Sequence, residues 1–358
     1  MINFIIGTKA QFIKCIPVIN EFISNDIKIT IYDLKQHSEI TSNLRDKILH
    51  GYTYIEFSNN KKNLGTYFGL IKWFFRNLLK IILIRQKKIK SQYCFVHGDT
   101  LSTLLGSFLV KANKGKLILL EAGHPVPGIF KHFPESVIRY ICAKLSDILI
   151  ANGASQLNQL KKWNVRGEII EISANTIYDS VSKVKIDSNN SNDVIVSIHR
   201  TENINSKNRM KLLVNSLIKI SNKFHITWYL HIPTKNKLKS FKLLNQLEEN
   251  KISTEDLQPY DLFINKLKNA KFIITDGGGV VEECSILGVP TLVWRNEHLD
   301  QNHIFENSNN LYLCNYDDEN IKYFFKNYKN FVFNFKKNNE NPSKQIVDIL
   351  STKFLNNF

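Results

Sequence analysis

The sequence has few cysteines, and their arrangement excludes two classes of stabilised scaffold. No C-x-x-C pair and no Cys/His cluster is present, so we expect neither a disulfide framework nor a metal site. Buried thiols in a reducing compartment fit this pattern. The amino terminus has neither the basic region nor the small-residue cleavage site of a signal peptide. We therefore expect a cytoplasmic protein. The five cysteines are odd in number and far apart, at Cys15, Cys94, Cys142, Cys284 and Cys314.

A nucleic-acid-binding signature is also lacking, although the chain is strongly basic. It has 48 Lys and Arg against 32 Asp and Glu, a formal net charge of +16. Such an excess fits an anionic partner such as a nucleotide or an acidic lipid. The charge is spread over Lys/Asn/Ile-rich stretches, with no helix-turn-helix, zinc-finger or aromatic RNA-reading motif. We expect no nucleic-acid partner.

No apolar run is long enough to span a bilayer. In the stretch 69–90, Lys72, Arg76 and Lys80 recur every four residues, leaving a wide apolar stripe with one basic face. Two interpretations stay open. The stretch is either a crossover helix that covers a sheet or an interfacial helix in peripheral contact with an anionic membrane.

The length of 358 residues favours two domains over a single core. Short apolar strands alternate with helical stretches, which is typical of parallel α/β sheets covered on both faces. In the first series we expect strands at 3–7, 27–32, 93–97, 117–120 and 148–151, with helices up to 22 and at 101–112, 135–145 and 154–162. In the second we expect strands at 194–198, 226–232, 272–275 and 291–294, with helices at 209–221, 262–269 and 280–287.

A polar stretch at 182–193 is the expected linker between two Rossmann-like domains. The first domain is expected at 1–181 and the second at 194–342, while a C-terminal helix within 343–358 can pack back on the first. Two such domains facing each other place a cleft at the carboxyl ends of both sheets.

Three carboxylates follow strand ends or open a helix in the first domain. Asp99 follows the strand at 93–97, Glu121 follows the strand at 117–120, and Glu135 begins a helix after a proline. Any one alone is commonly a cap or a surface charge, but three in neighbouring turns favour one pocket. Crowded carboxylates repel, so we expect a raised pKa for at least one and general acid–base chemistry.

The second domain offers phosphate-binding groups at two turns. His199 and Arg200 end a strand and both can bind a diphosphate. Three glycines, Gly277, Gly278 and Gly279, lie between a strand and a helix, where backbone N–H groups are open to phosphate. A glutamate one turn into this helix can bind both hydroxyls of a ribose.

Together these motifs resemble the bacterial non-hydrolysing UDP-N-acetylglucosamine 2-epimerases, which have the glycosyltransferase-B fold. The resemblance extends over nearly the whole chain, from Gly7-Thr8 to about Arg295. The motifs that fall in family order are His97-Gly98-Asp99-Thr100, Glu121-Ala122-Gly123, Pro134-Glu135, His199-Arg200-Thr201-Glu202-Asn203 and Thr275-Asp276-Gly277-Gly278-Gly279 with Glu282-Glu283.

The resemblance implies roles for individual residues and a UDP-sugar substrate. One base removes the C2 proton, UDP leaves C1 with anti geometry, and the glycal is re-protonated on the other face as UDP returns, with no metal or other cofactor implied. The implied catalytic residues are Asp99, Glu121, Glu135 and His199. The implied substrate-binding residues are Lys9, Lys14, Arg139, Arg200, Gly277, Gly278, Gly279 and Glu283.

Several departures from the family surround the sugar and the diphosphate. They leave two functions open: an NDP-sugar 2-epimerase for surface polysaccharide, or a glycosyltransferase of the same fold with a polysaccharide or lipid-linked acceptor. The nucleotide-sugar and a homodimer are also left open. The departures are Lys9-Ala10-Gln11 for Arg-Pro-Glu, His124-Pro125 for Leu-Arg, Gly277 for serine, and His298-Leu299-Asp300-Gln301-Asn302 for Thr-Glu-Arg-Pro-Glu.

Overall fold

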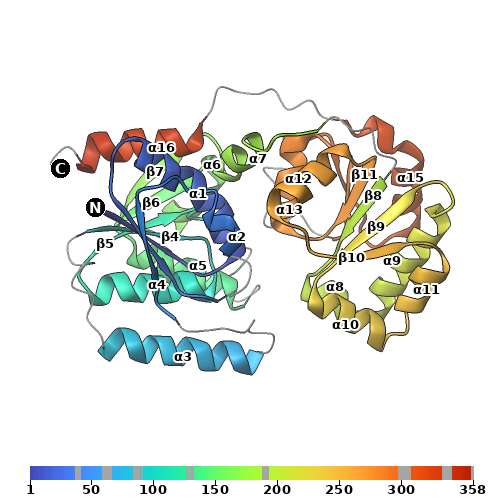
Figure 1. The fold of residues 1–358 in the computed structure, drawn as a ribbon, viewed down its shortest axis with the longest axis horizontal. Coiled ribbons are helices and arrows are strands. Elements are labelled where there is room, and N and C mark those ends of the chain that lie inside the picture. Colours follow the sequence, from blue (N-terminus) through green and yellow to red (C-terminus); the bar gives the residue numbers. More distant parts are fainter. Residues whose placement is uncertain are drawn as a thin grey trace. The chain divides into compact units, whose positions relative to one another are not determined.

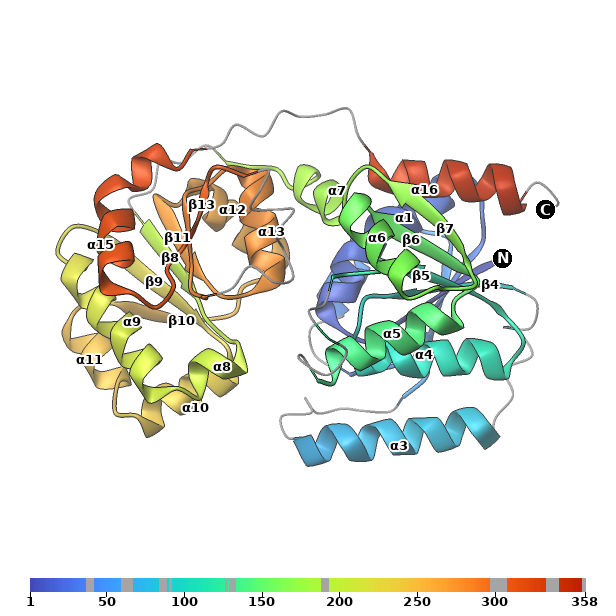
Figure 2. The ribbon, with the colours of Figure 1, turned by 180° about the vertical axis from the view of Figure 1, so that it is seen from behind.

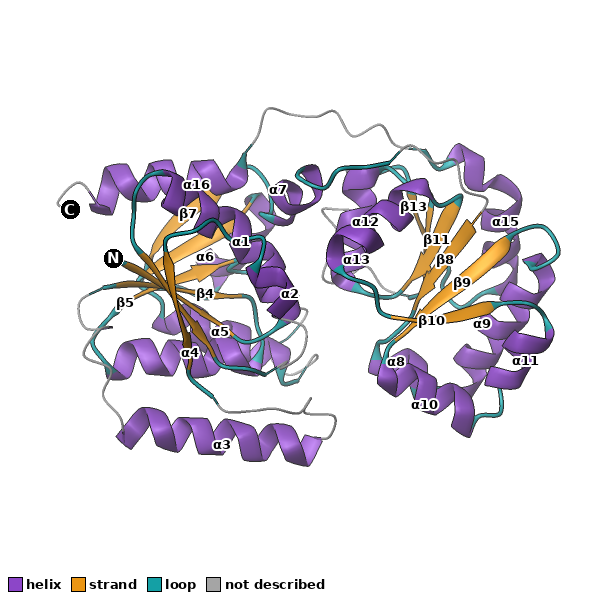
Figure 3. Ribbon diagram, in the orientation of Figure 1, coloured by secondary structure: helices purple, strands orange, loops and turns teal. Residues whose placement is uncertain are grey.

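The computed structural model divides the chain into two compact α/β units (Figures 1 and 3). The first unit is Met1–Ser180 with Asn339–Phe358, and the second is Val181–Asn338. The prediction of two parallel-sheet domains is confirmed. The structure describes residues 1–36, 42–58, 67–83, 89, 92–125, 128, 133–187, 193–296, 308–332 and 341–355.

The first unit is built on a seven-stranded parallel sheet with the order β3-β2-β1-β4-β5-β6-β7. Strand order reverses between β1 and β4, which are hydrogen-bonded neighbours. In such a sheet the ligand crevice lies beyond the carboxyl ends of the strands at the reversal. The strands are β1 (Ile2–Ile6), β2 (Ile29–Asp33), β3 (Tyr52–Glu56), β4 (Tyr93–His97), β5 (Lys116–Leu120), β6 (Ile148–Asn152) and β7 (Glu168–Ile172).

Helices cover both faces of this sheet, and a helix from the end of the chain joins them. Figure 2 shows α16 beside β7, and it packs on α1. The backbone N–H of Ser343 donates to the Asp179 carboxylate at 2.8 Å. The helices are α1 (Lys9–Ser24), α2 (Ser42–Arg45), α3 (Tyr67–Leu83), α4 (Leu101–Ala112), α5 (Glu135–Leu145), α6 (Ala154–Lys162), α7 (Ile177–Ser182) and α16 (Pro342–Leu350), which continues into a π turn, η3 (Ser351–Leu355).

The second unit repeats the plan on six parallel strands with the order β10-β9-β8-β11-β12-β13. Here the order reverses between β8 and β11, so the turns after these two strands border the crevice. The strands are β8 (Asp193–Ser197), β9 (His225–Leu230), β10 (Ser253–Asp256), β11 (Phe272–Thr275), β12 (Thr291–Val293) and β13 (Leu311–Leu313). The helices are α8 (Thr201–Ile204), α9 (Lys207–Ile220), α10 (Ile232–Ser240), α11 (Leu244–Glu249), α12 (Tyr260–Asn269), α13 (Gly278–Leu287) and α15 (Asp318–Asn327), followed by a 3-10 turn, η2 (Tyr328–Asn330).

Some predicted segments lie partly outside the described residues. Residues 188–192 of the expected linker are among them, as are 84–88 and 90 of the stretch 69–90. The segment His298–Asn302 also lies outside. Within the described part of the chain, every helix is too short or too polar to cross a membrane.

Candidate active site

Glu121 sits in a tightly constrained turn after β5. Its backbone φ is +56°, in the left-handed region that residues other than glycine rarely adopt. Two residues on, Gly123 has φ +83°, and a Cβ there would lie 2.5 Å from the carbonyl oxygen of Gln156. Only glycine fits this position. Strained backbone of this kind is concentrated at functional sites, so the geometry supports a special role for the turn.

The Glu121 carboxylate is buried among three cationic or hydrogen-bonding side chains. Lys14 Nζ donates to both of its oxygens, at 2.8 and 2.9 Å. His124 Nε2 lies 2.7 Å from Oε1, and His97 Nε2 lies 2.9 Å from Oε2. Four side chains from α1, β4 and the β5 turn therefore form one network, here called the Glu121 network.

This network keeps Glu121 ionised. Burial acts to raise the pKa of Glu121, but Lys14 and the hydrogen bonds from His124 and His97 outweigh it and hold the pKa well below its usual range. We expected a raised pKa for at least one of the three acids, and Glu121 is not that one. Its close neighbours are basic side chains, not the other acids.

Asp99 and Glu135 lie in different surroundings. Arg139 Nε donates to Asp99 Oδ2 at 2.5 Å, so α5 supplies a cation to the turn after β4. Glu135 is exposed at the first residue of α5, one turn before Arg139. Of the three acids, Asp99 and Glu121 thus have ion pairs within the described structure, while Glu135 faces solvent.

The start of α1 is tied to β4 by Gln11, a residue that the sequence pattern did not single out for this role. Its Oε1 accepts from the backbone N–H groups of Gly7 and Thr8, at 2.9 and 3.1 Å. Its Nε2 donates to the carbonyl of His97 at 2.8 Å and to Thr103. A glutamate could not donate these last bonds. Glutamine here thus has a structural reason. Lys9, the first residue of α1, is partly buried.

In the second unit a buried carboxylate, Asp276, organises the turn after β8. Its two oxygens accept from the backbone N–H groups of His199 and Arg200, at 2.9 and 3.0 Å. Asn203 Nδ2 adds a bond of 2.8 Å, and Arg295 Nε donates to the Asp276 carbonyl at 2.7 Å. Sequence reasoning assigned no role to Asp276, Asn203 or Arg295. Asp276 was visible within the Thr-Asp-Gly-Gly-Gly motif, but its contacts with His199, Arg200 and Asn203 were not.

His199 is fixed by close contacts on two sides. Its ring packs on His231, with centroids 4.5 Å apart and planes 33° apart. A Cβ on Gly277 would lie 2.5 Å from His199 Cε1, so the ring occupies the space that a side chain at 277 would need. Burial lowers the pKa of His199, although Asp276, whose Oδ1 lies 3.5 Å from Nδ1, acts against this. Burial outweighs Asp276, so the pKa of His199 lies below its usual value.

The start of α13 has the features of a phosphate site. Gly277 is its N-cap, with no side-chain capping bond, and Gly278 and Gly279 are its first two residues. A Cβ on Gly279 would meet no heavy atom within 4 Å, so space is open there. Backbone N–H groups at a helix start favour an anion. Arg200, which follows His199 in the turn after β8, forms an ion pair with Glu202.

Glu283 lies in the second turn of α13 and is buried against α12. Burial raises the pKa of Tyr260 well above its ordinary value, and the neighbouring Glu283 carboxylate raises it further. Glu282 is buried as well. Glu283, the residue predicted to bind the ribose, therefore lies at the packed face between α12 and α13, next to Tyr260.

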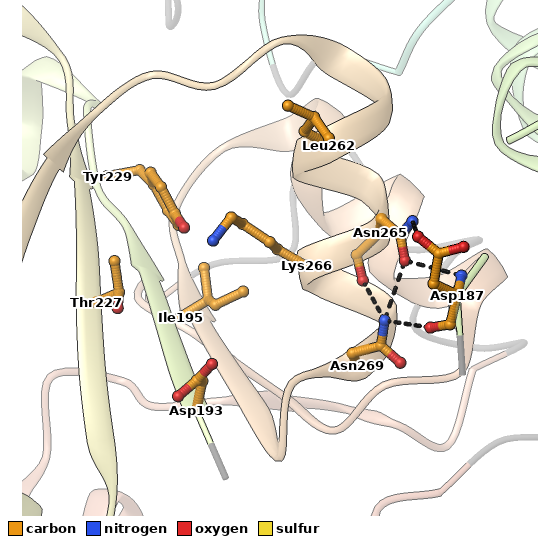
Figure 4. Close-up of a pocket in the computed structure, with 9 residues that line it drawn as sticks. All are labelled: Asp187, Asp193, Ile195, Thr227, Tyr229, Leu262, Asn265, Lys266 and Asn269. Atoms are coloured by element: carbon orange, nitrogen blue, oxygen red, sulfur yellow. Dashed lines mark hydrogen bonds between the residues drawn. The ribbon is translucent and has the colours of Figure 1, made fainter. Parts of the chain in front are cut away.

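A separate pocket of about 260 Å³ lies at the other end of the second sheet (Figure 4). It is bordered by the amino end of β8 and by α12, whereas His199 follows the carboxyl end of β8. Lys266 points toward Tyr229 in it, and its Nζ lies 5.8 Å from the ring centroid. None of the predicted site residues lines this pocket. The lining is Asp187, Asp193, Ile195, Thr227, Tyr229, Leu262, Asn265, Lys266 and Asn269.

The predicted residues thus form two sets, one in each unit. Lys14 and Glu121 meet directly in the first unit, as do Asp99 and Arg139, while Glu135 stands apart. In the second unit the turn after β8 meets Asp276, and its His199 ring lies against Gly277, the N-cap of α13.

Comparison with known proteins identifies the family. A family model described as UDP-N-acetylglucosamine 2-epimerase matches residues 70–351. The UDP-N-acetylglucosamine 2-epimerase of Methanococcus maripaludis is 29% identical over 340 residues, covering 89% of each chain. That of Methanocaldococcus jannaschii is 29% identical over 316 residues, covering 82% of this chain and 83% of its own.

Solved structures share the fold. The M. jannaschii enzyme in complex with UDP-GlcNAc and UDP has a TM-score of 0.79 at 24% identity, covering 98% of this chain and 99% of its own. The Neisseria meningitidis enzyme bound to UDP-GlcNAc has a TM-score of 0.80 at 22% identity, with the same coverage. The family model spans most of the chain, and we conclude that the chain belongs to the UDP-N-acetylglucosamine 2-epimerase family.

Proposed function

We propose that this protein is an NDP-sugar 2-epimerase acting on UDP-N-acetylglucosamine or a related UDP-2-acetamido sugar, for surface polysaccharide biosynthesis. The observation that carries the proposal is the ionised, buried Glu121 at a strand end, in a chain that matches the epimerase family over residues 70–351. Relatives from two archaea bear the same enzyme name. Solved structures of the fold have been obtained with UDP-GlcNAc bound.

The nucleotide is assigned to the second unit. Gly278 and Gly279 are assigned to hold the diphosphate through backbone N–H groups at the start of α13. The open space over Gly279 supports this assignment. Glu283 is to bind the ribose. His199 and Arg200, both fixed through Asp276, are to contact the diphosphate as it leaves and returns.

The proton transfers are assigned to the first unit. Epimerisation breaks the C2–H and C1–O bonds, releases UDP with the electron pair of the C1–O bond, and then re-forms both bonds with hydrogen on the opposite face of C2. Glu121 enters as an ionised carboxylate and so suits the proton acceptor. Glu135, exposed at the start of α5, is assigned the role of proton donor. Asp99, held by Arg139, is the third proposed acid–base residue.

The departures from the family point to a changed sugar pocket. His124 stands where the family has leucine, and it contacts the Glu121 carboxylate directly. Lys9 replaces an arginine fork with a point charge, which gives up geometric control of a phosphate while retaining attraction. Lys14, also assigned to the substrate, has Glu121 as its partner here. The glycosyltransferase alternative is not favoured, since the matching family and relatives are epimerases.

Three finer points belong to the same proposal. The domain bounds of 1–181 and 194–342, with the linker at 182–193, are kept as proposed limits of the two functional halves. Two partners are proposed besides the UDP-sugar. One is a second copy of the chain in a homodimer, and the other is an anionic membrane in peripheral contact with residues 69–90. The cytoplasm is the proposed compartment.

The deciding experiment is incubation of the purified protein with UDP-N-acetylglucosamine in deuterated water, followed by NMR. We expect a C2 epimer and deuterium at C2 in both sugars. An epimer without deuterium at C2 would contradict the assigned proton transfers. Release of UDP with neither epimer nor C2 exchange would overturn the epimerase function and bring back the transferase.

A further inference from the structure

Tyr316 contacts the buried amide that supports the turn carrying His199. It lies in the loop between β13 and α15, and its hydroxyl donates to Asn203 Oδ1 at 2.7 Å. Asn203 is fully buried, and its Nδ2 donates to Asp276 Oδ2 and to the Trp294 carbonyl, at 2.8 and 3.0 Å. Both hydrogens of the amide have acceptors in this way, which leaves its oxygen to accept from Tyr316.

The tyrosine hydroxyl fixes which way the Asn203 amide faces. Burial raises the pKa of Tyr316 to about 12, so the hydroxyl keeps its proton at neutral pH and acts as the donor. Rotating the amide by half a turn would set its oxygen against the Asp276 carboxylate, where two acceptors repel. Without the hydroxyl, the buried amide oxygen would lose the donor that the structure gives it, which is costly.

The ring of Tyr316 is held from two sides, and its backbone is strained. The Arg209 guanidinium carbon lies 4.0 Å from the ring centroid, and Arg209 Nη1 donates to the Glu202 carbonyl at 3.1 Å. The Trp294 ring packs edge-on, with centroids 6.1 Å apart. Asn315 and Tyr316 both have a φ of +55°, in the left-handed region that residues other than glycine rarely adopt. Strain of this kind persists where surrounding contacts enforce it, and it is concentrated at functional sites.

These contacts link the loop after β13 to the groups assigned to the diphosphate. Asp276 accepts from the backbone N–H groups of His199 and Arg200, so its position sets theirs. Its Oδ2 accepts from both the Arg200 N–H and the Asn203 amide. A displaced Asn203 amide would therefore displace the carboxylate, and with it the turn after β8.

We propose that Tyr316 is a positioning residue for the reaction, which acts through Asn203 and Asp276 to hold the turn after β8 in the form that receives the diphosphate. The inference rests on the function proposed above. Negative charge grows on the diphosphate as the C1–O bond breaks, so the groups around it matter most at that point. A displaced turn should therefore lower kcat more than it raises KM.

The test is Tyr316→Phe, which removes the hydroxyl and keeps the ring against Arg209 and Trp294. We expect kcat for epimerisation of UDP-N-acetylglucosamine to fall about tenfold, the equivalent of one hydrogen bond, while KM changes by less than about threefold. Calorimetric titration with UDP needs no turnover. Because UDP carries the charge that the leaving group acquires, its dissociation constant should rise about tenfold as well.

Tyr312→Phe is the matched control, because Tyr312 makes the same kind of bond without contacting the turn. Its hydroxyl donates to Asn320 Oδ1 at 3.2 Å, between β13 and α15. Both variants should lower the melting temperature, but only Tyr316→Phe should change kcat and the UDP dissociation constant. In a His199→Gln background, Tyr316→Phe should weaken UDP binding less than it does in the wild type, because the two changes act through one group.

The possible failures are distinguishable. An active enzyme whose kcat and UDP dissociation constant are unchanged in Tyr316→Phe would overturn the positioning role. Equal losses in Tyr312→Phe would overturn it too, because they would reflect the general stability of the second unit, as would additive losses with His199→Gln. A wild type that binds UDP but forms no C2 epimer would overturn the proposed function instead, and the UDP dissociation constants would then decide the role of Tyr316.

Discussion

In the first unit the proposed catalytic carboxylate is held by side chains, whereas in the second unit a carboxylate holds the backbone. Glu121 is surrounded by Lys14, His97 and His124. Asp276 accepts from backbone N–H groups after β8 and supports the turn that carries His199. The first arrangement sets a protonation state, and the second sets a geometry. Acid–base chemistry needs the former, and diphosphate binding needs the latter.

The largest effect is expected for Glu121→Gln, which removes the charge while preserving the shape. Lys14 then loses the ionised partner that it has in the wild type, and breaking a buried pair costs about 3–5 kcal/mol. The rate should fall by about a hundredfold or more, since proton transfer is lost. Steady-state kinetics and denaturant unfolding measure the two effects.

Glu135→Gln is the matched control, because it changes an exposed acid on the same unit. We expect a similar loss of rate with an unfolding free energy within about 0.5 kcal/mol of the wild type. If both variants keep full stability, the Glu121 network does not set the protonation state as described.

Asp276→Asn probes the second arrangement. The amide can accept through one oxygen only, so one of the two backbone N–H groups of His199 and Arg200 loses its partner, at a cost of about 1–3 kcal/mol. Because the turn is displaced, UDP affinity should fall about tenfold or more. Calorimetric titration with UDP measures this. An unchanged dissociation constant in the folded variant would contradict the role of Asp276 in positioning the turn.

Gly277→Ser restores the family residue, yet we expect it to be unfavourable here. The new Cβ would lie 2.5 Å from the His199 ring, so the ring has to move, at a cost of about 1–3 kcal/mol. In Gly279→Ser the Cβ meets no heavy atom within 4 Å, and the ligand-free stability should not fall. Thermal unfolding without UDP compares the two variants. Equal melting temperatures would show that His199 moves without cost.

The smallest effect is a difference in pH dependence. Glu121 has a lowered pKa in the fold, so its contribution to stability is complete above the ordinary value of 4.5 and is lost as the pH falls below it. His199 also has a lowered pKa, so the unfolded chain takes up its proton first and stability falls as the pH drops below 6.5. We expect His199→Gln to lose the decline in stability below pH 6.5, and Glu121→Gln to lose the decline below pH 4.5. Unfolding of both variants across the two pH ranges measures this. A wild-type-like profile in His199→Gln would contradict the first.

Central elements of the fold were predictable because their sequences are uniform. The strand at 272–275 and the helices at 101–112, 135–145 and 154–162 have the predicted bounds. The outer strands β3, β7, β10 and β13 were missed. Of these, β3 and β7 mix exposed with buried positions, so their sequences lack the continuous apolar run of a central strand.

The site was predictable as motifs but not as contacts. Asp99 and Glu121 follow strand ends, and a strand end can be located from the sequence. Lys14, however, comes 107 residues before Glu121, and Gln11 comes 86 before His97, so local spacing does not reveal either bond. For this reason the lowered pKa of Glu121 could not be predicted from the motifs. Its sign depends on partners that only the tertiary structure brings near.

The return of α16 to the first unit has a consequence for synthesis on the ribosome. The second unit is an insertion in the first, since Asn339–Phe358 belongs with Met1–Ser180. Ile346, Val347 and Leu350 are buried in α16, so the first unit lacks part of its core until these residues have been made. Domains generally fold as they emerge. Here the domain that starts first is completed last, and a nascent chain that stops before residue 342 leaves the α1 surface uncovered.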